Sequence, residues 1–216
     1  MNVAIVKYNA GNVYSVVNAL RRLGIEPTLT DDAEQLRQAD CVLFPGQGEA
    51  RGAMEYLKAR RLDEVIRSLK QPVLGICVGQ QLLCRHSEEG NVDCIGVFDA
   101  NVVKFQPKHH EDKVPCMGWN TLQPPPTPYS GSNQDNVCKL FRGLLPAQNN
   151  VLAEQPYAYF VHSYYVPLCQ ETAAVADYIL PYSAAMHKDN FYACQFHPEK
   201  SGHVGELILR NFLDLQ

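Results

Sequence analysis

Short apolar runs alternate with amphipathic stretches through the first half of the chain. The runs that predict strands are residues 2–8, 25–30, 41–44 and 72–76. Between them, apolar residues recur at helical spacing, and these stretches are 13–23, 31–39, 53–69 and a segment that begins at 79. Apolar strands that alternate with helices predict a parallel sheet covered by helices on both faces.

The second half has a different pattern, with many aromatic and β-branched residues. The segments with this pattern, which predicts strands, are 94–105, 151–166, 172–180 and 191–196. A closing amphipathic stretch, 204–215, predicts a helix, and the Pro-, Ser- and Asn-rich segment 123–136 predicts a surface loop. We therefore expect an α/β fold of three layers, with a mostly parallel sheet, flanking helices and added antiparallel strands, in one domain over residues 1–216.

Composition and charge narrow the function classes. Apolar residues make up 46% and charged residues 19% of the 216 positions, which is typical of a globular chain. The net charge is −4 and no basic stripe is present, which argues against nucleic-acid binding. The start, MNVAIVKYNAGN, lacks the features of a signal peptide, and no apolar segment has the length of a membrane span. We expect a cytosolic protein with no membrane partner.

The eight cysteines are spread along the chain, at 41, 77, 84, 94, 116, 138, 169 and 194. No two of them form a C-x-x-C pair, and a chain of this size does not need disulfides for stability. We expect reduced thiols, most of them buried as small apolar groups. We expect no metal site, because the spacing lacks clustered ligands, and we expect no cofactor.

Cys77 differs from the others because it lies between two glycines directly after an apolar run, in PVLGICVGQQLL. A sharp turn from strand to helix can lift one side chain above the sheet edge, as in the G-x-S-x-G elbow of α/β hydrolases. The following helix would favour a thiolate, and the N–H of Val78 would face a developing oxyanion. The alternative is a buried cysteine beside Gly75 and Gly79, which would then serve close helix–strand packing.

His197 and Glu199 form the second candidate, in QFHPEKSG at 195–202. A carboxylate two residues from a histidine can hold the far nitrogen of the imidazole, which is how a catalytic base is oriented. Read alone, the same segment could be a surface turn with solvated charges. Together with an elbow cysteine, it predicts a nucleophile, a base and an orienting acid.

The third candidate is the loop FPGQGEA at 44–50, in which Gly46 and Gly48 are one residue apart. Such a loop can turn backbone N–H groups toward a negative charge. The glycine spacing fits neither a dinucleotide fingerprint nor a phosphate-binding G-K-[ST] loop. Its alternative is an ordinary strand-to-helix turn. All three candidates follow predicted strands, where open α/β sheets carry their sites.

The P-G-x-G loop, the G-I-C-x-G-x-Q elbow and the F-H-P-E motif occur here in the order in which class I (triad) glutamine amidotransferases have them, and the chain resembles that family nearly end to end. Within it, the chain is similar to the glutaminase subunits of imidazole glycerol phosphate synthases, enzymes of histidine biosynthesis. The stretches YNAGNVYSV, MGWN and FVHSYY carry that closer resemblance.

The resemblance implies an enzyme that hydrolyses glutamine to glutamate and ammonia. Cys77 would attack the side-chain amide carbon, His197 would pass the thiol proton to the departing ammonia, and Glu199 would hold the imidazole. The implied oxyanion hole comprises Gly46, Gly48 and Val78. The implied glutamine-binding residues are Gln81, Glu89, Ser163 and Tyr164.

The same resemblance implies a partner, a (β/α)8-barrel cyclase subunit. This subunit would receive the ammonia within a heterodimer and form imidazole glycerol phosphate and AICAR, so that the complete synthase is a lyase. The positions that would meet the partner are Asn12, Trp119 and Lys200. Read without the resemblance, Trp119 could fill the core, Asn12 could cap a helix, and Gln81 and Glu89 could face solvent.

Three other functions remain open from the sequence. The chain could be a glutaminase subunit for a different synthase, of the anthranilate, pyridoxal phosphate or GMP type. It could be a catalytically silent binding subunit that kept the fold, although the intact Cys77, His197 and Glu199 argue against that. It could also be a free-standing γ-glutamyl cysteine hydrolase, which would turn over at full rate without a partner.

Overall fold

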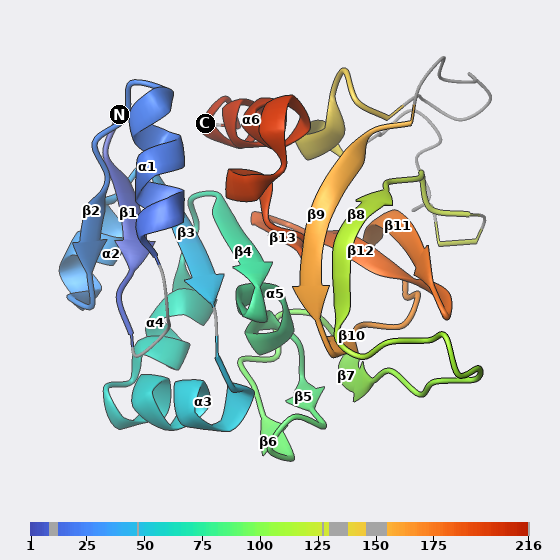
Figure 1. Ribbon diagram of the computed structural model, residues 1–216. Coiled ribbons are helices and arrows are strands. Elements are labelled where there is room, and N and C mark those ends of the chain that lie inside the picture. Colours follow the sequence, from blue (N-terminus) through green and yellow to red (C-terminus); the bar gives the residue numbers. More distant parts are fainter. Residues whose placement is uncertain (9–12, 47, 127, 130–137, 146–154, 216) are drawn as a thin grey trace.

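The structure is a computed structural model that describes residues 1–8, 13–46, 48–126, 128–129, 138–145 and 155–215. Within these residues, a central seven-stranded sheet has the strand order β11-β12-β13-β4-β3-β1-β2 (Figure 1). Its strands are β1 (Val3–Val6), β2 (Thr28–Thr30), β3 (Cys41–Gly46), β4 (Val73–Cys77), β11 (Thr172–Tyr178), β12 (Leu180–Lys188) and β13 (Phe191–Cys194). The five strands from β13 to β2 are parallel, and β12 and β11 extend the sheet in antiparallel pairing.

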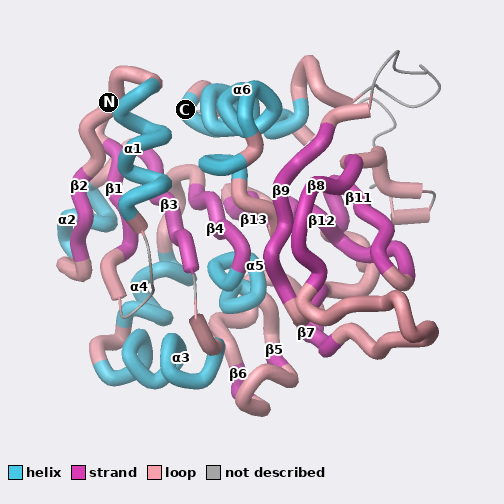
Figure 2. Tube along the Cα trace, in the orientation of Figure 1, coloured by secondary structure: helices cyan, strands magenta, loops and turns pink. Residues whose placement is uncertain are grey.

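Helices cover both faces of the sheet. They are α1 (Tyr14–Arg22), α2 (Ala33–Gln38), α3 (Ala50–Ala59), α4 (Leu62–Ser68), α5 (Val78–Leu83) and α6 (Gly202–Leu213), with short 3₁₀ turns η1 (Lys139–Phe141) and η2 (Pro198–Lys200). Helix α1 lies in front of the sheet in Figures 1 and 2, and α2 and α4 lie behind it. The predicted three-layer α/β fold with a mostly parallel sheet is therefore confirmed.

Two smaller sheets complete the chain. One has the order β10-β7-β5-β6, and the other pairs β8 with β9. Their strands are β5 (His86–Ser87), β6 (Val92–Asp93), β7 (Asn101–Lys104), β8 (Cys116–Thr121), β9 (Tyr157–His162) and β10 (Tyr164–Tyr165). The β8–β9 ribbon lies beside the antiparallel end of the central sheet, which is joined to it by a bridge between Gln123 and Val175.

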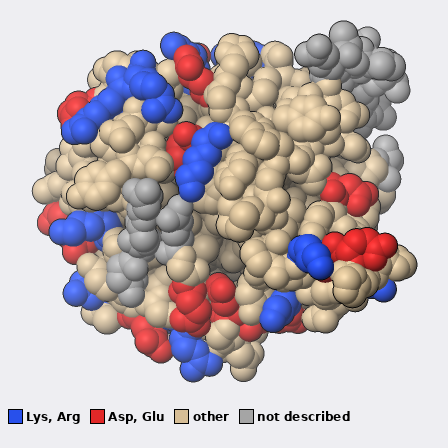
Figure 3. Space-filling model, viewed as in Figure 1, with Lys and Arg blue, Asp and Glu red and all other residues tan. Residues whose placement is uncertain are grey.

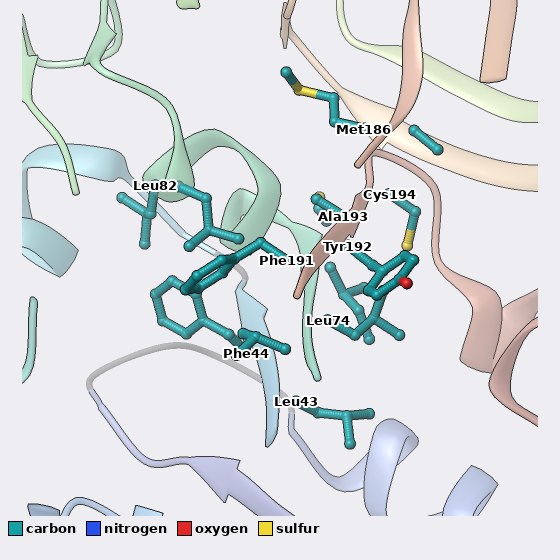
Figure 4. Close-up of a cluster of buried hydrophobic side chains, with 14 of the residues drawn as sticks. Leu43, Phe44, Leu74, Leu82, Met186, Phe191, Tyr192, Ala193 and Cys194 are labelled. Carbon is teal, nitrogen blue, oxygen red and sulfur yellow. The ribbon is translucent and has the colours of Figure 1, made fainter. Parts of the chain in front are cut away.

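The core follows from the apolar runs of the parallel strands. Leu43, Phe44 and Leu74 are fully buried on β3 and β4, and Tyr192 and Cys194 of the neighbouring β13 join them (Figure 4). Strands buried on both faces read as continuous apolar runs, which is why the sequence identified them. The same packing fixes the register that brings the strand ends together.

Register sets the position of the candidate residues. Gly46, the last residue of β3, pairs with Cys77, the last residue of β4. On the other side of β4, Cys194 at the end of β13 pairs with Ile76. The carboxyl ends of three parallel strands thus meet at one edge of the sheet, where sites of open α/β folds lie.

The structure corrects two predicted elements. The single helix predicted over 53–69 is two helices, and Arg61 between them has the left-handed conformation, with φ of 55°. Buried Leu57 and Leu62 are five residues apart, a step that one straight helix would place on different faces, so the break lets both enter the core. In addition, the predicted strand 94–105 is extended only over Asn101–Lys104.

All eight cysteines are free thiols, and six of them are buried. In the described part of the chain, no helix combines the length and the apolar character that crossing a membrane requires. Most of the predicted loop at 123–136, including 127 and 130–136, lies outside the described residues.

Candidate active site

Cys77 occupies a sharp turn between strand β4 and helix α5. Its backbone has φ of 55° and ψ of −109°, a conformation that a residue with a side chain rarely adopts. Strain of this kind persists where the surroundings hold it, and it is concentrated at functional sites. Val78 begins the helix directly after it, so the predicted elbow is present in the structure.

The glycines around Cys77 are required by close packing. A Cβ on Gly79 would lie 1.8 Å from the carbonyl oxygen of Phe44, and one on Gly75 would lie 2.8 Å from Cδ1 of Leu83. Both glycines therefore let α5 approach β3 and β4 closely, as the packing interpretation of the sequence requires. The close approach of α5 also gives the elbow its shape. The close-packing glycines and the elbow around Cys77 are therefore the same arrangement.

His197 and Glu199 lie next to the elbow, just after strand β13. Nδ1 of His197 is 2.8 Å from Oε1 of Glu199, and the two side chains are only 4% and 2% exposed. The imidazole also lies near enough to Cys77 for the two side chains to interact electrostatically. Since Nδ1 is taken by the carboxylate, Nε2 faces the sulfur. The three residues predicted as a triad, from distant parts of the chain, are in contact in the required order.

The electrostatics of this trio favour a charged imidazole. Burial works against the charge, but the hydrogen bonds and the negative charges of Cys77 and Glu199 prevail and raise the pKa of His197 to about 9. An imidazolium next to a sulfur stabilises the thiolate, which is the nucleophilic form of cysteine. The arrangement can therefore generate a nucleophile and hold its proton.

Backbone contacts from strand β9 fix the same residues. The N–H of His197 donates to the carbonyl of Tyr159 at 2.9 Å. The sulfur of Cys77 lies 3.8 Å from the carbonyl oxygen of Val161, two residues further along β9. The hydroxyl of Ser201 donates to the carbonyl of His197 at 2.6 Å and accepts from the N–H of Tyr159 at 3.0 Å.

Of the predicted oxyanion residues, Gly46 and Val78 are adjacent at the elbow. A Cβ on Gly46 would lie 2.8 Å from Cβ of Val78 and 2.5 Å from the hydroxyl of Tyr8, so only glycine fits there. Gly48 is exposed and has φ of +120°, which favours glycine for conformational reasons. Gln47, between the two glycines, lies outside the described residues.

The predicted glutamine-binding residues come from α5, from the segment after β5, and from the junction of β9 and β10. Gln81 is buried, so it does not face solvent, and its Nε2 donates to the carbonyl of Tyr164 at 3.1 Å. Ser163 precedes Tyr164, and its backbone carbonyl accepts from the N–H of Phe105 at 3.0 Å. These contacts bring two of the predicted segments together beside Cys77.

Glu89 is half-buried and accepts from the N–H of Ala50, the first residue of α3, at 3.0 Å. Burial raises the pKa of Glu89, and the charge of Glu49 adds to that effect while the Ala50 bond opposes it. The pKa of Tyr164 is likewise raised by burial and then by the charges of Glu89 and other acidic residues. On this face, a hollow opens near the centre with acidic side chains along its lower rim (Figure 3).

Of the predicted partner contacts, Trp119 is 56% exposed on β8, so it does not fill the core. It is part of an exposed apolar group with Met117 and Tyr157 on the β8–β9 ribbon. Lys200 is exposed at the end of η2. Asn12 lies outside the described residues, and α1 has Val13 rather than Asn12 at its cap position.

One buried side chain at the site was not predicted. Gln195 is fully buried, and its Nε2 lies 3.7 Å from the sulfur of Cys77. Its Oε1 accepts from Nε2 of Gln81 at 3.0 Å. The signal in the sequence was its position two residues before His197, at the end of the same strand-like run.

Comparisons with known proteins agree with this geometry. Residues 4–215 match the family model described as glutamine amidotransferase class-I. The chain is 58% identical over 215 residues to the imidazole glycerol phosphate synthase subunit HisH of Bacteroides thetaiotaomicron, with 100% of each chain covered. It is 40% identical over 216 residues to the protein of the same name from Escherichia coli K12, again with 100% of each chain covered.

Solved structures agree in fold. A crystal structure of a glutamine amidotransferase superposes with a TM-score of 0.67 at 18% identity, covering 98% of this chain and 97% of the other. PurLQS from Thermotoga maritima superposes with a TM-score of 0.62 at 16% identity, with the same coverage of 98% and 97%. At these identities the likeness concerns the fold.

Proposed function

The chain belongs to the class I glutamine amidotransferase family, and from that premise we propose that it is the glutaminase subunit of an imidazole glycerol phosphate synthase in histidine biosynthesis. The observation that carries the chemistry is the buried His197–Glu199 pair just after β13, next to the strained elbow that holds Cys77 at the end of β4. The full-length identity of 58% to a subunit of that name supports the assignment to this synthase.

In the first half-reaction, the sulfur of Cys77 attacks the side-chain amide carbon of glutamine while His197 holds the thiol proton. The tetrahedral intermediate carries its negative charge toward the N–H of Val78 and the loop of Gly46 and Gly48. His197 then gives its proton to the leaving nitrogen, ammonia departs, and a γ-glutamyl thioester remains on Cys77. Glu199 stabilises the imidazolium throughout.

In the second half-reaction, neutral His197 removes a proton from water, and the resulting hydroxide attacks the thioester. Collapse of the second tetrahedral intermediate releases glutamate, and the proton on His197 returns to Cys77. Gln81, Glu89, Ser163 and Tyr164 hold the glutamine. The acidic Glu89 suits its α-ammonium group, since opposite charges attract most strongly in a partly buried site.

The ammonia passes to a cyclase partner, a (β/α)8 barrel that forms imidazole glycerol phosphate and AICAR. We propose that Trp119, Lys200 and Asn12 contribute to the contact with this partner. An exposed aromatic side chain with apolar neighbours is typical of the centre of a protein interface, and Trp119 with Met117 has that character. The chain forms a single domain and is one subunit of a cytoplasmic heterodimer.

The test is glutamate release by the complex with its cyclase partner and the cyclase ligand. Cys77→Ala is expected to abolish glutamine hydrolysis. Cys41→Ala is the matched control, because Cys41 is also buried in a strand of the central sheet, at the end remote from the site, and it is expected to keep the activity. Hydrolysis by a folded Cys77→Ala variant would remove the assigned nucleophile.

A second measurement distinguishes the free-standing hydrolase. The isolated chain is expected to hydrolyse glutamine slowly, and the rate is expected to rise when the cyclase partner and its ligand are added. A full rate in the isolated chain would instead favour a γ-glutamyl cysteine hydrolase that needs no partner.

A further inference from the structure

Gln195 is a fully buried amide in direct contact with the sulfur of Cys77, and the mechanism above gives it no role. It follows strand β13, and its Nε2 lies 3.7 Å from Sγ. That distance is within the range of a hydrogen bond to sulfur. A buried glutamine is costly unless its polar atoms are satisfied, so its partners define what it does.

The orientation of this amide follows from its neighbours. Nε2 of Gln81 is 3.1 Å from the carbonyl oxygen of Tyr164, and a carbonyl only accepts, so Gln81 must turn its NH₂ group in that direction. The same nitrogen lies 3.0 Å from Gln195, which must therefore present its oxygen. The NH₂ group of Gln195 then points to the sulfur of Cys77.

We propose that Gln195 is a positioning residue for the nucleophile, whose amide N–H donates to the sulfur of Cys77 and stabilises the thiolate; this rests on the proposed function. A hydrogen bond to a charged acceptor is about twice as strong as one to a neutral acceptor. The contact therefore strengthens when Cys77 loses its proton. The carbonyl of Val161, 3.8 Å from the same sulfur, can accept only from the thiol.

Among the residues that the structure describes, three titratable groups interact electrostatically with Cys77. They are His197 after β13, Tyr8 after β1 and Cys194 at the end of β13. The Tyr8 hydroxyl donates to the carbonyl of Pro45 at 2.8 Å, so its hydrogen is not directed at the sulfur. Burial raises the pKa of Cys194 well above its usual range, which keeps that thiol neutral. Gln195 thus supplies a neutral donor that complements the charge of His197.

The shared amide contact also connects the nucleophile to the glutamine pocket. Gln81 touches both Gln195 and Tyr164, and Tyr164 is further held by Nδ1 of His162 at 2.8 Å. Loss of the Gln195 amide should therefore affect the reactivity of the sulfur more than substrate affinity, because Gln81 keeps its bond to Tyr164. In kinetic terms, kcat should fall more than KM rises.

The experiment compares Gln195→Met with Gln80→Met. Gln80 is an equally buried glutamine one residue before Gln81, and its Nε2 donates to the carbonyl of Ser183 at 3.1 Å, away from Cys77. Two readouts are measured: kcat and KM for glutamine in the complex with the cyclase, and the rate of alkylation of Cys77 by iodoacetamide from pH 6 to 9, followed by peptide mass analysis.

Gln195→Met is expected to lower kcat about tenfold, since a hydrogen bond to a charged group is worth at least that factor. It is also expected to slow alkylation of Cys77 near neutral pH and to move the midpoint of the pH profile upward. Gln80→Met should leave the profile in place. Wild-type alkylation and kcat in a folded Gln195→Met variant would overturn the proposal.

Two further variants keep the outcomes distinct. If Gln195→Met does not fold, Gln195→Leu carries the same comparison, because it also removes the NH₂ donor and introduces no charge beside Cys77. If Cys77→Ala still hydrolyses glutamine, the proposed function fails. If Cys77→Ala is inactive while both Gln195 variants match the wild type, the positioning role alone fails.

Discussion

His162 is a buried histidine beneath the site whose protonation should weaken the fold in acid. Nδ1 lies 2.8 Å from the carbonyl of Tyr164 and Nε2 lies 3.3 Å from the hydroxyl of Tyr182. Because the carbonyl can only accept, Nδ1 carries the hydrogen and Nε2 accepts from the tyrosine. Burial lowers the pKa of His162 to about 4. The bond to Tyr164 acts in the opposite direction and raises the pKa, and the charge of His197 lowers it further.

The size of the stability loss follows from the lowered pKa of His162. The pKa of His162 is about 4 in the folded chain against a reference value of 6.5. One pKa unit corresponds to about 1.4 kcal/mol, so this histidine can cost the fold about 3 kcal/mol in acid. The unfolded chain binds the extra proton below pH 6.5, so stability falls from there to about pH 4 and is unaffected by this group above 6.5. At pH 5.0 the loss should be about 2 kcal/mol.

The variant that isolates this effect is His162→Gln, since glutamine also supplies one donor and one acceptor but does not titrate. Urea unfolding of wild type and variant is measured at pH 7.5 and pH 5.0. The variant is expected to be the less stable chain at pH 7.5, because it fills the site less well. Its deficit should shrink by about 2 kcal/mol at pH 5.0, because only the wild type loses the contribution of a neutral histidine.

Tyr182→Phe is the matched control. It removes the hydroxyl that faces Nε2 of His162 and keeps the histidine, so its stability should still fall between the two pH values about as steeply as that of the wild type. If the wild type and His162→Gln lose the same free energy of unfolding between pH 7.5 and 5.0, His162 is not the buried neutral group described above.

Three more substitutions test other parts of the site. Gly79→Ala should destabilise the chain by about 3 kcal/mol or more, because its Cβ would lie 1.8 Å from the backbone oxygen of Phe44; a wild-type denaturation midpoint would contradict this. Glu199→Gln should lower the pKa of His197 from about 9 and reduce kcat about 100-fold or more, and an unchanged pH–rate profile would remove Glu199 from the triad. Trp119→Ala should weaken binding of the cyclase about 30-fold, measured by titration calorimetry, and an unaltered Kd would exclude Trp119 from the interface.

The parallel part of the fold could be predicted because its signals are local. Each strand is a short buried run, and each helix repeats apolar residues on one face, so the sequence near each element is sufficient. The break at Arg61 could not be predicted in this way, since arginine carries no signal for a left-handed conformation. Strand β12 was missed because it contains Pro181 and owes its extended form to pairing with β11 and β13 on its two sides.

The triad could be predicted for a similar reason, since each motif is a few residues long and has a recognisable chemistry. Gln195 lies beside one of these motifs, yet its role depends on contacts with Gln81 and Cys77, which are 114 and 118 residues away in the sequence. The bond between Glu89 and the start of α3 is likewise visible only in three dimensions. Contacts of this range leave no periodic pattern in one sequence.

Strand β9 links the exposed apolar face to the triad through its backbone. On one edge it pairs with β8, where Tyr159 lies opposite exposed Trp119. The carbonyl of that same Tyr159 accepts from the N–H of His197, and the carbonyl of Val161 lies next to the sulfur of Cys77. The strand that pairs with β8 thus also contacts both the base and the nucleophile. Spatial continuity of this kind is a structural condition for coupling, and the coupling itself is measured by comparing kcat for glutamine with and without the cyclase.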